Sequence, residues 1–281
     1  MKSAPVFVII CPTRKSLHMK RQAFIIKVVL LAHTPEPEKI IAASAKLCYS
    51  ASGIENIMDG LTDAETARFT AMLESMGHES PVEHAVFTFG IEGVSRSFLA
   101  QITRHRIASY SVKSQRYVSE SDFEYVIPPE IEEIPEAKAE FTAAMEEDAR
   151  HYKKLRALLL EHRREKFAAE GKSEKAALSS AKKAANEDAR FVLPNACETK
   201  LICTFDARSL MHFFSLRCCM RAQWEIRAVA DEMLRLVKEA APDIFKTAGP
   251  PCLRGACPEG KMSCGKADEV RKRFLGYGAK T

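Results

Sequence analysis

The residues best suited to chemistry lie together in one stretch, Gln101 to Tyr117, which reads QITRHRIASYSVKSQRY. It contains four cationic side chains, one histidine and three serines, namely Arg104, Arg106, Lys113, Arg116, His105, Ser109, Ser111 and Ser114. An arginine guanidinium is always charged and offers a planar fork of donors, so arginines beside hydroxyl groups suit a phosphorylated or otherwise anionic ligand. The stretch therefore predicts an oxyanion-binding site.

The same stretch has a simpler interpretation as a helix end. Upstream of it, Phe98, Leu99 and Ile102 recur at helical spacing, which predicts an amphipathic helix that ends near Arg104. Cations near a helix C-terminus complement the helix dipole, and most charge clusters are solvated surface. A basic helix end without a ligand is thus the alternative to an anion site.

The order of residues in this stretch resembles the signature of the flavin-dependent thymidylate synthases (the ThyX family), written RHRxxSxNxxSxRY. The matching residues are Arg104, His105, Arg106, Ser109, Ser114, Arg116 and Tyr117. Three further blocks follow the family's order: GHESPVEHAVFTF (77–89), ARFVLP (189–194) and DARSLMHFFSLRCCMRAQWEI (206–226). The resemblance runs from Pro37 to Ala241, and four separated blocks make chance a poor account of it.

The resemblance implies both a fold and an activity. The fold is α/β of the α+β type, with an antiparallel sheet flanked by helices and a helical insertion over residues 130–190. The activity is the conversion of dUMP to dTMP, with methylenetetrahydrofolate as carbon donor, NADPH as reductant and FAD as the cofactor that delivers the hydride. The family uses no cysteine nucleophile, and the implied assembly is a homotetramer with active sites at subunit interfaces.

The resemblance also assigns roles to individual residues. Arg217 matches the arginine that holds the pyrimidine and favours ionisation of its N3 position, so it is the predicted catalytic residue. The predicted dUMP ligands are Gln101, Arg104, Ser114, Gln115, Arg116, Arg190 and Arg217. The predicted FAD ligands are His78, Ser80, Glu83, Arg104, His105, Arg106, Asp206, Ala207, Arg208 and His212.

The chain departs from the family pattern at four positions. Ser111 stands where the family usually has Asn, and Val112 where many members have Glu. Asn also usually occupies the positions of Asp206 and His212. Any flavin or nucleotide contact made by the usual side chains is lost or replaced here. These departures keep open an alternative function, a non-catalytic nucleotide- or RNA-binding protein that retained the fold.

Several candidate residues also have structural interpretations. Asp206 precedes a helix and is well placed to cap it. Cys218 and Cys219 adjoin Arg217 and raise the alternative of a thiolate nucleophile, but two adjacent cysteines on a helix cannot both face one pocket. We therefore interpret them as packing residues. Ser114 lacks a recognisable histidine and acid to activate it, which favours a ligand contact over a nucleophile.

Two groups of residues raise the question of a metal. His78 to His84 holds two histidines and two glutamates, but the spacing is not that of a helical H-E-x-x-H site, and Pro81 interrupts it. For His84 alone, a buried, hydrogen-bonded core histidine is the preferred interpretation. In the tail, Cys252, Cys257 and Cys264 are one ligand short of a structural zinc site. No metal site is therefore predicted, and a flexible, redox-sensitive tail is the simpler interpretation.

Hydrophobic periodicity and helix caps predict the elements that position these residues. Strands are predicted at 24–32, 86–91, 123–127 and 198–205, and helices at 38–47, 63–76, 130–169, 174–191, 210–217 and 223–241. Thr62 with Glu65 forms a capping-box pattern before the second helix, and Gly77 can end it. No GxGxxG loop occurs, which disfavours a Rossmann-type flavin fold.

The composition of the chain limits which binding partners and which cellular compartment we expect. In the 281 residues, 42 Lys and Arg against 37 Asp and Glu leave a mild positive excess, which suits a small anionic ligand as well as it suits nucleic acid. Aromatic residues are not interleaved with the basic runs, and no apolar run is long enough to span a bilayer, so neither nucleic acid nor membrane is a predicted partner. Nine unevenly spread cysteines do not form a secreted disulfide framework, which predicts a cytoplasmic location.

The predicted organisation has three parts. Residues 1–18 form a possible disordered extension, since their apolar run is broken by Pro12 and is too short for a signal peptide. A catalytic domain covers residues 19–248. A tail containing Cys, Gly and Pro covers residues 249–281.

Overall fold

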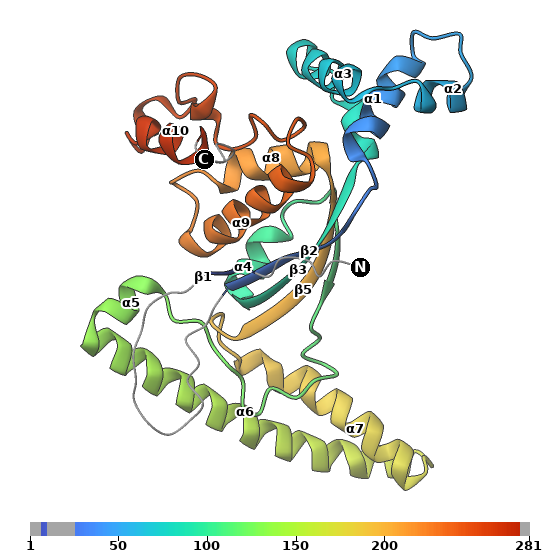
Figure 1. The fold of residues 1–281 in the computed structure, drawn as a ribbon. Helices are drawn as coiled ribbons and strands as arrows, with labels where there is room; N and C mark the ends of the chain where they lie inside the picture. Colours follow the sequence, from blue (N-terminus) through green and yellow to red (C-terminus); the bar gives the residue numbers. More distant parts are fainter. Residues whose placement is uncertain (1–6, 10–25, 276–281) are drawn as a thin grey trace. The chain divides into compact units, whose positions relative to one another are not determined.

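The structure, a computed structural model, describes residues 7–9 and 26–275 (Figure 1). Its centre is a five-stranded sheet in the order β1-β2-β3-β5-β4. The strands are β1 (Phe7–Ile9), β2 (Ile26–His33), β3 (Val86–Ser95), β4 (Ser109–Val112) and β5 (Glu198–Asp206). Both β1 and β3 pair antiparallel with β2, with Val8 opposite Lys27 and Val28 opposite Ile91. The predicted α/β class with an antiparallel sheet is confirmed.

Ten α-helices and four 3₁₀ helices accompany the sheet in the described part of the chain. The α-helices are α1 (Pro37–Leu47), α2 (Ile54–Asp59), α3 (Asp63–Met76), α4 (Arg96–Ile102), α5 (Pro129–Glu133), α6 (Pro135–Ala169), α7 (Glu174–Ala189), α8 (Ala207–Arg217), α9 (Trp224–Ala240) and α10 (Ala267–Leu275). The 3₁₀ helices are η1 (Ser80–His84), η2 (Arg190–Val192), η3 (Pro251–Leu253) and η4 (Gly260–Met262).

The chain forms two compact units. The described residues of the first unit are 7–9, 26–92, 101–111 and 201–275, and those of the second unit are 93–100 and 112–200.

The core of the first unit lies between the sheet and the helices α8 and α9. Along β3, Phe87, Phe89 and Ile91 are completely buried while the residues between them are less so, as the alternating pattern predicts. Helix α9 packs against β2 and α8 packs against α9 (Figure 1). Phe245 closes this core with ring contacts to Phe87 and Phe214, at centroid distances of 5.3 and 6.0 Å. The candidate residues on α8 therefore stand on a rigid support.

Helix α3 begins and ends where its sequence predicts. The Thr62 hydroxyl accepts from the backbone N–H of Glu65, and the Glu65 carboxylate accepts in return from the N–H of Thr62. Gly77 ends the helix with a φ of 67°, a left-handed conformation that glycine adopts without a steric penalty. His78 and η1 follow directly, so this cap fixes where the first candidate ligands begin.

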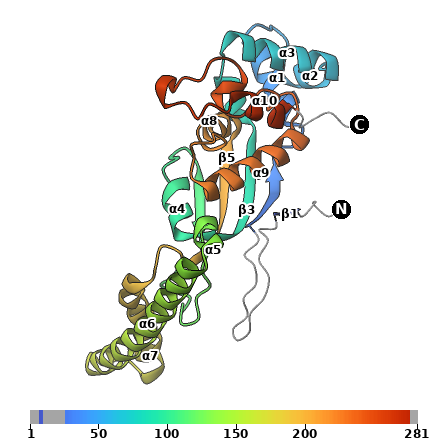
Figure 2. The same cartoon turned by 90° about the vertical axis from the view of Figure 1, so that its left-hand side faces the viewer.

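The second unit is dominated by the helical hairpin of α6 and α7, which lie side by side in both views (Figures 1 and 2). Helix α7 begins at the predicted cap Ser173, whose hydroxyl accepts from the N–H of Ala176. Its buried residues include four alanines at every fourth position, Ala177, Ala181, Ala185 and Ala189. Such a small-residue face lets the two helices approach closely. Of the apolar residues on α6, only Met145 and Tyr152 are buried.

Some sequence expectations differ from the structure or fall outside it. The strand predicted at 123–127 is wrong, because that segment forms only the isolated bridge between Tyr125 and Cys197. Of the predicted extension 1–18, the structure describes only residues 7–9, which form β1, and the remainder lies outside the described residues. The described part of the tail 249–281 carries η3, η4 and α10.

Among the described helices, none combines the length and apolarity that crossing a membrane requires.

Candidate active site

The N-terminal end of α8 is joined to η1 in the first unit. The N–H of Ala207 donates to the carbonyl oxygen of Ala85 over 2.8 Å. The Arg208 guanidinium binds the carboxylates of Glu79 and Glu83, at 2.8 and 2.5 Å. The hydrogen bond that Arg208 donates to Glu83 and the negative charge of Glu79 raise the pKa of Arg208. Two of the predicted flavin ligands, Glu83 and Arg208, are thus brought together, and sequence reasoning missed Glu79, which lies between the candidates His78 and Ser80.

Asp206 and Ala207 serve the start of α8. One carboxylate oxygen of Asp206 accepts from the backbone N–H of Ser209 at 2.8 Å, and the other accepts from the Ser209 hydroxyl at 2.7 Å. Asp206 is therefore the N-cap of α8, as its position in the sequence indicates. Ala207 is completely buried and its N–H is used, so neither its methyl group nor its N–H is available to a ligand.

The turn after α4 presents Arg104, His105 and Arg106. The backbone N–H of His105 donates to the carbonyl oxygen of Ile102 over 3.1 Å. The Tyr110 hydroxyl lies 2.8 Å from the carbonyl oxygens of both Ile102 and His105 and serves them as donor. Arg104 and Arg106 are exposed while His105 is half-buried. The turn is thereby held in shape, with its two arginines facing solvent.

His105 and Arg217 form the central contact of the site. The Nε of Arg217 donates to Nε2 of His105 over 3.0 Å, which requires that this ring nitrogen carry no proton. Burial, followed by the charges of Arg217 and His212, lowers the pKa of His105 to about 4. The ring also packs edge-on against Phe213, with a centroid distance of 4.9 Å. His105 is therefore a neutral acceptor at physiological pH and holds the guanidinium of Arg217 in one orientation.

The guanidinium of Arg217 feels the positive charge of a second arginine of this unit, Arg104. Burial lowers the pKa of Arg217, and the charge of Arg104 lowers it further. No carboxylate is paired with either guanidinium among the ion pairs of the described residues. Two interacting cations without a counter-ion favour binding of an anion. Gln101, the third predicted dUMP ligand of this unit, is half-buried at the end of α4.

The remaining predicted dUMP ligands lie in the second unit. The Ser114 hydroxyl accepts from the N–H of Arg116 over 3.3 Å. An Nη of Arg116 binds the carboxylate of Glu187 at 3.1 Å, whereas its Nε is buried and has no hydrogen-bond partner among the described residues. Gln115 is buried, with its amide 3.6 Å from the sulfur of Cys197. Arg190 is half-buried and forms the C-cap of α7.

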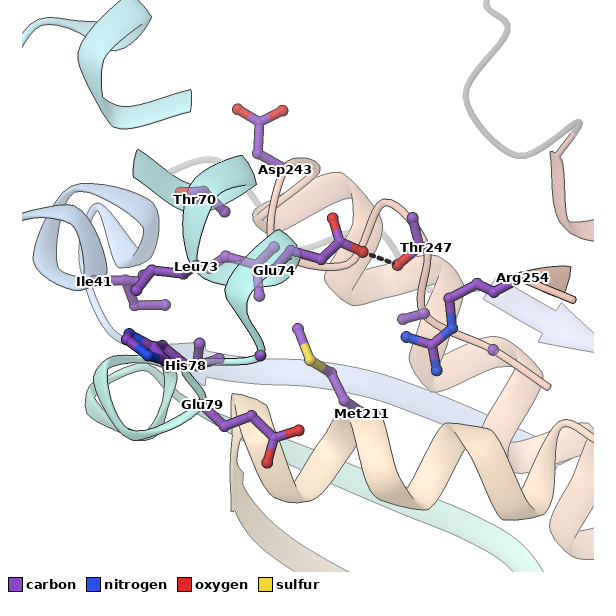
Figure 3. Close-up of a pocket in the computed structure, with 15 residues that line it drawn as sticks. Ile41, Thr70, Leu73, Glu74, His78, Glu79, Met211, Asp243, Thr247 and Arg254 are labelled. Atoms are coloured by element: carbon purple, nitrogen blue, oxygen red, sulfur yellow. Dashed lines mark hydrogen bonds between the residues drawn. The ribbon is translucent and has the colours of Figure 1, made fainter. Parts of the chain in front are cut away.

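The segment around His78 also borders a pocket of the first unit. This pocket of about 110 Å³ is lined by His78, Glu79, Met211, Arg254 and others, and has room for a few water molecules or a small polar group. Figure 3 shows Met211 of α8 reaching toward Glu74, whose carboxylate accepts from the Thr247 hydroxyl. His84 does not have the expected core position, because it is exposed at the end of η1, a 3₁₀ turn with no buried residue.

The cysteines nearest the site are held as thiols. Cys218, at the C-terminal end of α8, is completely buried, and burial raises the pKa of its thiol, with a further contribution from Asp231. Burial likewise raises the pKa of Cys203 to about 12. A thiol with a raised pKa is a poor nucleophile at neutral pH. This supports the interpretation of Cys218 as a packing residue.

Comparison with known proteins identifies similar chains. A family model described as "Thymidylate synthase complementing protein" matches residues 29–243. A protein of Clostridium tetani named "Flavin-dependent thymidylate synthase" is 51% identical over 257 residues, which is 92% of this chain and 100% of that relative. Proteins with the same name from Geobacter sulfurreducens and Nitratidesulfovibrio vulgaris are 48% and 46% identical, over 88% and 85% of this chain and 97% and 94% of their own lengths.

Proposed function

Because this chain belongs to the family of flavin-dependent thymidylate synthases, which are methyltransferases, we propose that it converts dUMP to dTMP with methylenetetrahydrofolate as carbon donor and NADPH as reductant. The observation that carries this proposal is a pair of guanidinium groups, Arg104 and Arg217, that lack a carboxylate partner among the described residues, with Arg217 held by a neutral His105. A nucleoside monophosphate offers such a pair both a phosphate and a polarisable pyrimidine.

Arg217 is the proposed catalytic residue. Its Nε is used by His105, and no other hydrogen bond of Arg217 occurs among the described residues, so its two Nη groups remain for a ligand. A guanidinium held in place next to the pyrimidine stabilises negative charge that develops on the ring and favours ionisation at N3. His105 acts through Arg217 here, because it orients the guanidinium without adding a charge of its own.

The proposed dUMP ligands lie in both units. In the first unit they are Gln101, Arg104 and Arg217, and in the second unit they are Ser114, Gln115, Arg116 and Arg190. The buried Nε of Arg116, which has no partner among the described residues, supports a ligand role for that side chain.

The flavin is proposed to be FAD, held by side chains around η1, the turn after α4 and the first turn of α8. The side chains are His78, Ser80, Glu83, Arg104, His105, Arg106, Asp206, Arg208 and His212. Their donor chemistry fits the group, because exposed guanidinium, hydroxyl and imidazole donors suit a dinucleotide with an anionic pyrophosphate. When bound, the flavin supplies the hydride transfer, and the protein supplies binding and orientation. Ala207 is left out of this set because it is buried.

Catalysis without a cysteine nucleophile is part of the proposal, and Cys218 tests it. The substitution Cys218→Ala removes the buried thiol next to Arg217. We expect dTMP formation in single-turnover experiments to stay within a few-fold of the unaltered protein, while the midpoint of urea unfolding falls because a packed and hydrogen-bonded group is lost. A folded variant that binds flavin and dUMP but forms no dTMP would revive the thiolate mechanism.

The direct test of the function is spectroscopic. The purified protein with FAD is examined anaerobically by visible absorption, before and after NADPH and with and without dUMP, and dTMP is then assayed after addition of methylenetetrahydrofolate. We expect flavin absorption that NADPH bleaches, a response to dUMP, and dTMP as product. A protein that takes up no flavin but binds nucleotides would instead support the non-catalytic alternative, for which Ser111 and Val112 are the motivating departures.

We further propose a homotetramer in the cytoplasm. All eight cysteines of the described part of the chain are free thiols, which supports a reducing compartment. The proposed partners are the small molecules dUMP, folate and NADPH, with no nucleic acid and no membrane.

A further inference from the structure

Tyr110 of β4 belongs to no ligand set of the proposed site, yet its hydroxyl meets the turn after α4 at two points. It lies 2.8 Å from the carbonyl oxygen of Ile102, the last residue of α4, and 2.8 Å from that of His105. The carbonyl groups of a last helical turn have no partner within the helix, so a donor from outside fixes them. The hydroxyl therefore sets where the backbone of His105 lies relative to the end of α4.

The Tyr110 hydroxyl remains a donor at physiological pH. Burial raises the pKa of Tyr110 above its ordinary value of 10. Carbonyl oxygens only accept, so both contacts depend on the single phenolic proton. The carbonyl oxygen of Ile102 also accepts from the backbone N–H of His105 over 3.1 Å. Removing the hydroxyl alone would thus release the carbonyl of His105 and weaken the hold on that of Ile102.

A series of ring contacts leads from Tyr110 to the side chain of the same histidine. The Tyr110 ring meets Phe205 of β5 edge-on, with a centroid distance of 5.8 Å and an interplanar angle of 89°. The Phe205 ring lies 5.7 Å from that of Phe213 on α8, and the Phe213 ring lies 4.9 Å from that of His105. Both phenylalanines are buried. Tyr110 thus supports both the backbone and the ring of His105, in a close-packed arrangement that leaves little room for displacement.

The position of His105 decides the orientation of Arg217. The Nε of Arg217 donates to Nε2 of His105 over 3.0 Å, and it is the nitrogen by which the guanidinium is held among the described residues. A displaced imidazole would therefore aim the two Nη groups in another direction. A misplacement of about 1 Å at a reacting centre can cost about 100-fold in rate.

We propose that Tyr110 is a positioning residue of the active site, whose hydroxyl holds His105 so that the Nη groups of Arg217 face the pyrimidine. This inference rests on the proposed conversion of dUMP. Tyr110 touches no substrate, and no bond of its hydroxyl forms or breaks in the reaction, so its contribution is geometric. The substitution Tyr110→Phe isolates that contribution, because it keeps the ring contact with Phe205 and removes only the donor.

The first test is the steady-state kinetics of Tyr110→Phe with dUMP as the varied substrate. We expect kcat for dTMP formation to fall about ten-fold, the order of effect of one lost hydrogen bond, and KM for dUMP to change less than about two-fold. In an Arg217→Ala background the same substitution should have no further effect, because no guanidinium remains to be oriented. A ten-fold fall in that background as well would overturn the proposal.

The matched control is Tyr152→Phe in the second unit. Tyr152 is completely buried, and its hydroxyl accepts from the backbone N–H of Glu120 over 3.2 Å, so this variant also loses one buried hydroxyl contact. We expect both variants to lower the midpoint of urea unfolding, but only Tyr110→Phe to lower kcat. Equal kcat values for the two variants would mean that Tyr110 serves the fold alone, which contradicts the proposal.

A second measurement does not require dTMP formation. The imidazole of His105 is followed by NMR between pH 4.5 and 7.5 in protein labelled at histidine, and its signal is identified by its absence from His105→Gln. In the unaltered protein we expect a pKa of about 4, set by burial and then by the charges of Arg217 and His212. In Tyr110→Phe we expect the pKa of His105 to move toward its ordinary value of 6.5, because the released ring gains access to solvent.

The NMR titration also separates this inference from the proposed function. An identical pKa of His105 in Tyr110→Phe and in the unaltered protein would overturn the positioning role, whatever reaction the chain catalyses. A raised pKa in a protein that forms no dTMP would support the hold of Tyr110 on His105 and would count against the proposed activity alone.

Discussion

One guanidinium nitrogen of Arg217, Nε, is bound to His105, and the two Nη groups are free to bind a ligand. The contribution of Arg217 to catalysis can therefore be measured by substitution. We expect Arg217→Ala to lower kcat for dTMP formation by about 100-fold or more, the loss typical when one charged transition-state donor is removed. Arg217→Lys keeps the charge but not the planar fork, so we expect it to recover only part of the rate. Flavin binding, measured by absorption after gel filtration, should be unchanged in both variants.

The control for Arg217 is Arg150→Ala. Arg150 is an exposed arginine of α6 that contacts Glu147 on the same helix, and the variant should keep full activity. If Arg217→Ala loses the flavin together with the activity, then the residue was assigned to the wrong ligand.

His105 makes the stability of the folded protein depend on pH, and the direction of this dependence follows from its pKa. Its pKa is about 4 when folded, against an ordinary value of 6.5, with burial as the largest cause. As pH falls from about 6.5 to about 4, the unfolded chain takes up a proton at this residue and the folded chain does not, so the free energy of unfolding decreases over that window. His105→Gln, whose amide oxygen can still accept from Arg217, should remove this contribution.

The measurement is urea unfolding of the unaltered protein and of His105→Gln at several pH values between 4.5 and 7. The unaltered protein should lose more stability on acidification than the variant does. Equal losses would mean that the pKa of His105 is not lowered in the folded protein, as expected if its contact to Arg217 does not form.

At the scale of elements, the capping role of Asp206 can be separated from a ligand role. Asn is about as good an N-cap as Asp, whereas Ala at this position costs about 1 kcal/mol. We therefore expect Asp206→Asn to keep the urea midpoint and Asp206→Ala to lower it. The affinity of both variants for the flavin then tests whether Asp206 is also a flavin ligand. A shared loss of affinity in Asp206→Asn and Asp206→Ala would mean that the carboxylate itself contacts the flavin.

The elements also show which features a sequence can predict. Thr62, Glu65 and Gly77 bound α3 correctly, because a capping box and a left-handed glycine act within a few residues of one another. The strand predicted at 123–127 is wrong because the pairing of this segment depends on a residue far along the chain. Among the described residues, the segment forms only the isolated bridge between Tyr125 and Cys197. The order of residue types in a motif predicts function well. Contacts between segments that are distant in the sequence become visible only in the folded structure.

At the scale of the whole molecule, the proposed homotetramer sets a mass. Light scattering behind gel filtration should give about four times the 31.4 kDa of the chain. If active sites form only at subunit interfaces, then specific activity should fall on dilution through the dissociation range, with the loss reversed by concentration. A monomer that keeps full specific activity would contradict both the assembly and its role.

The arrangement of the two units along the chain has a consequence for synthesis on the ribosome. The second unit is mostly one continuous segment, 112–200, whereas the first combines residues from 26–92 with residues from 201–275. Its last described helix is tied to α9 by the ion pair of Arg273 with Asp231. The helical hairpin can therefore fold while translation continues, but the first unit, which holds Arg217, must wait until residue 275 has left the exit tunnel. At about 5 to 20 residues per second, β2 and β3 stay unfinished for roughly 10 to 40 seconds, during which chaperones are their natural protection.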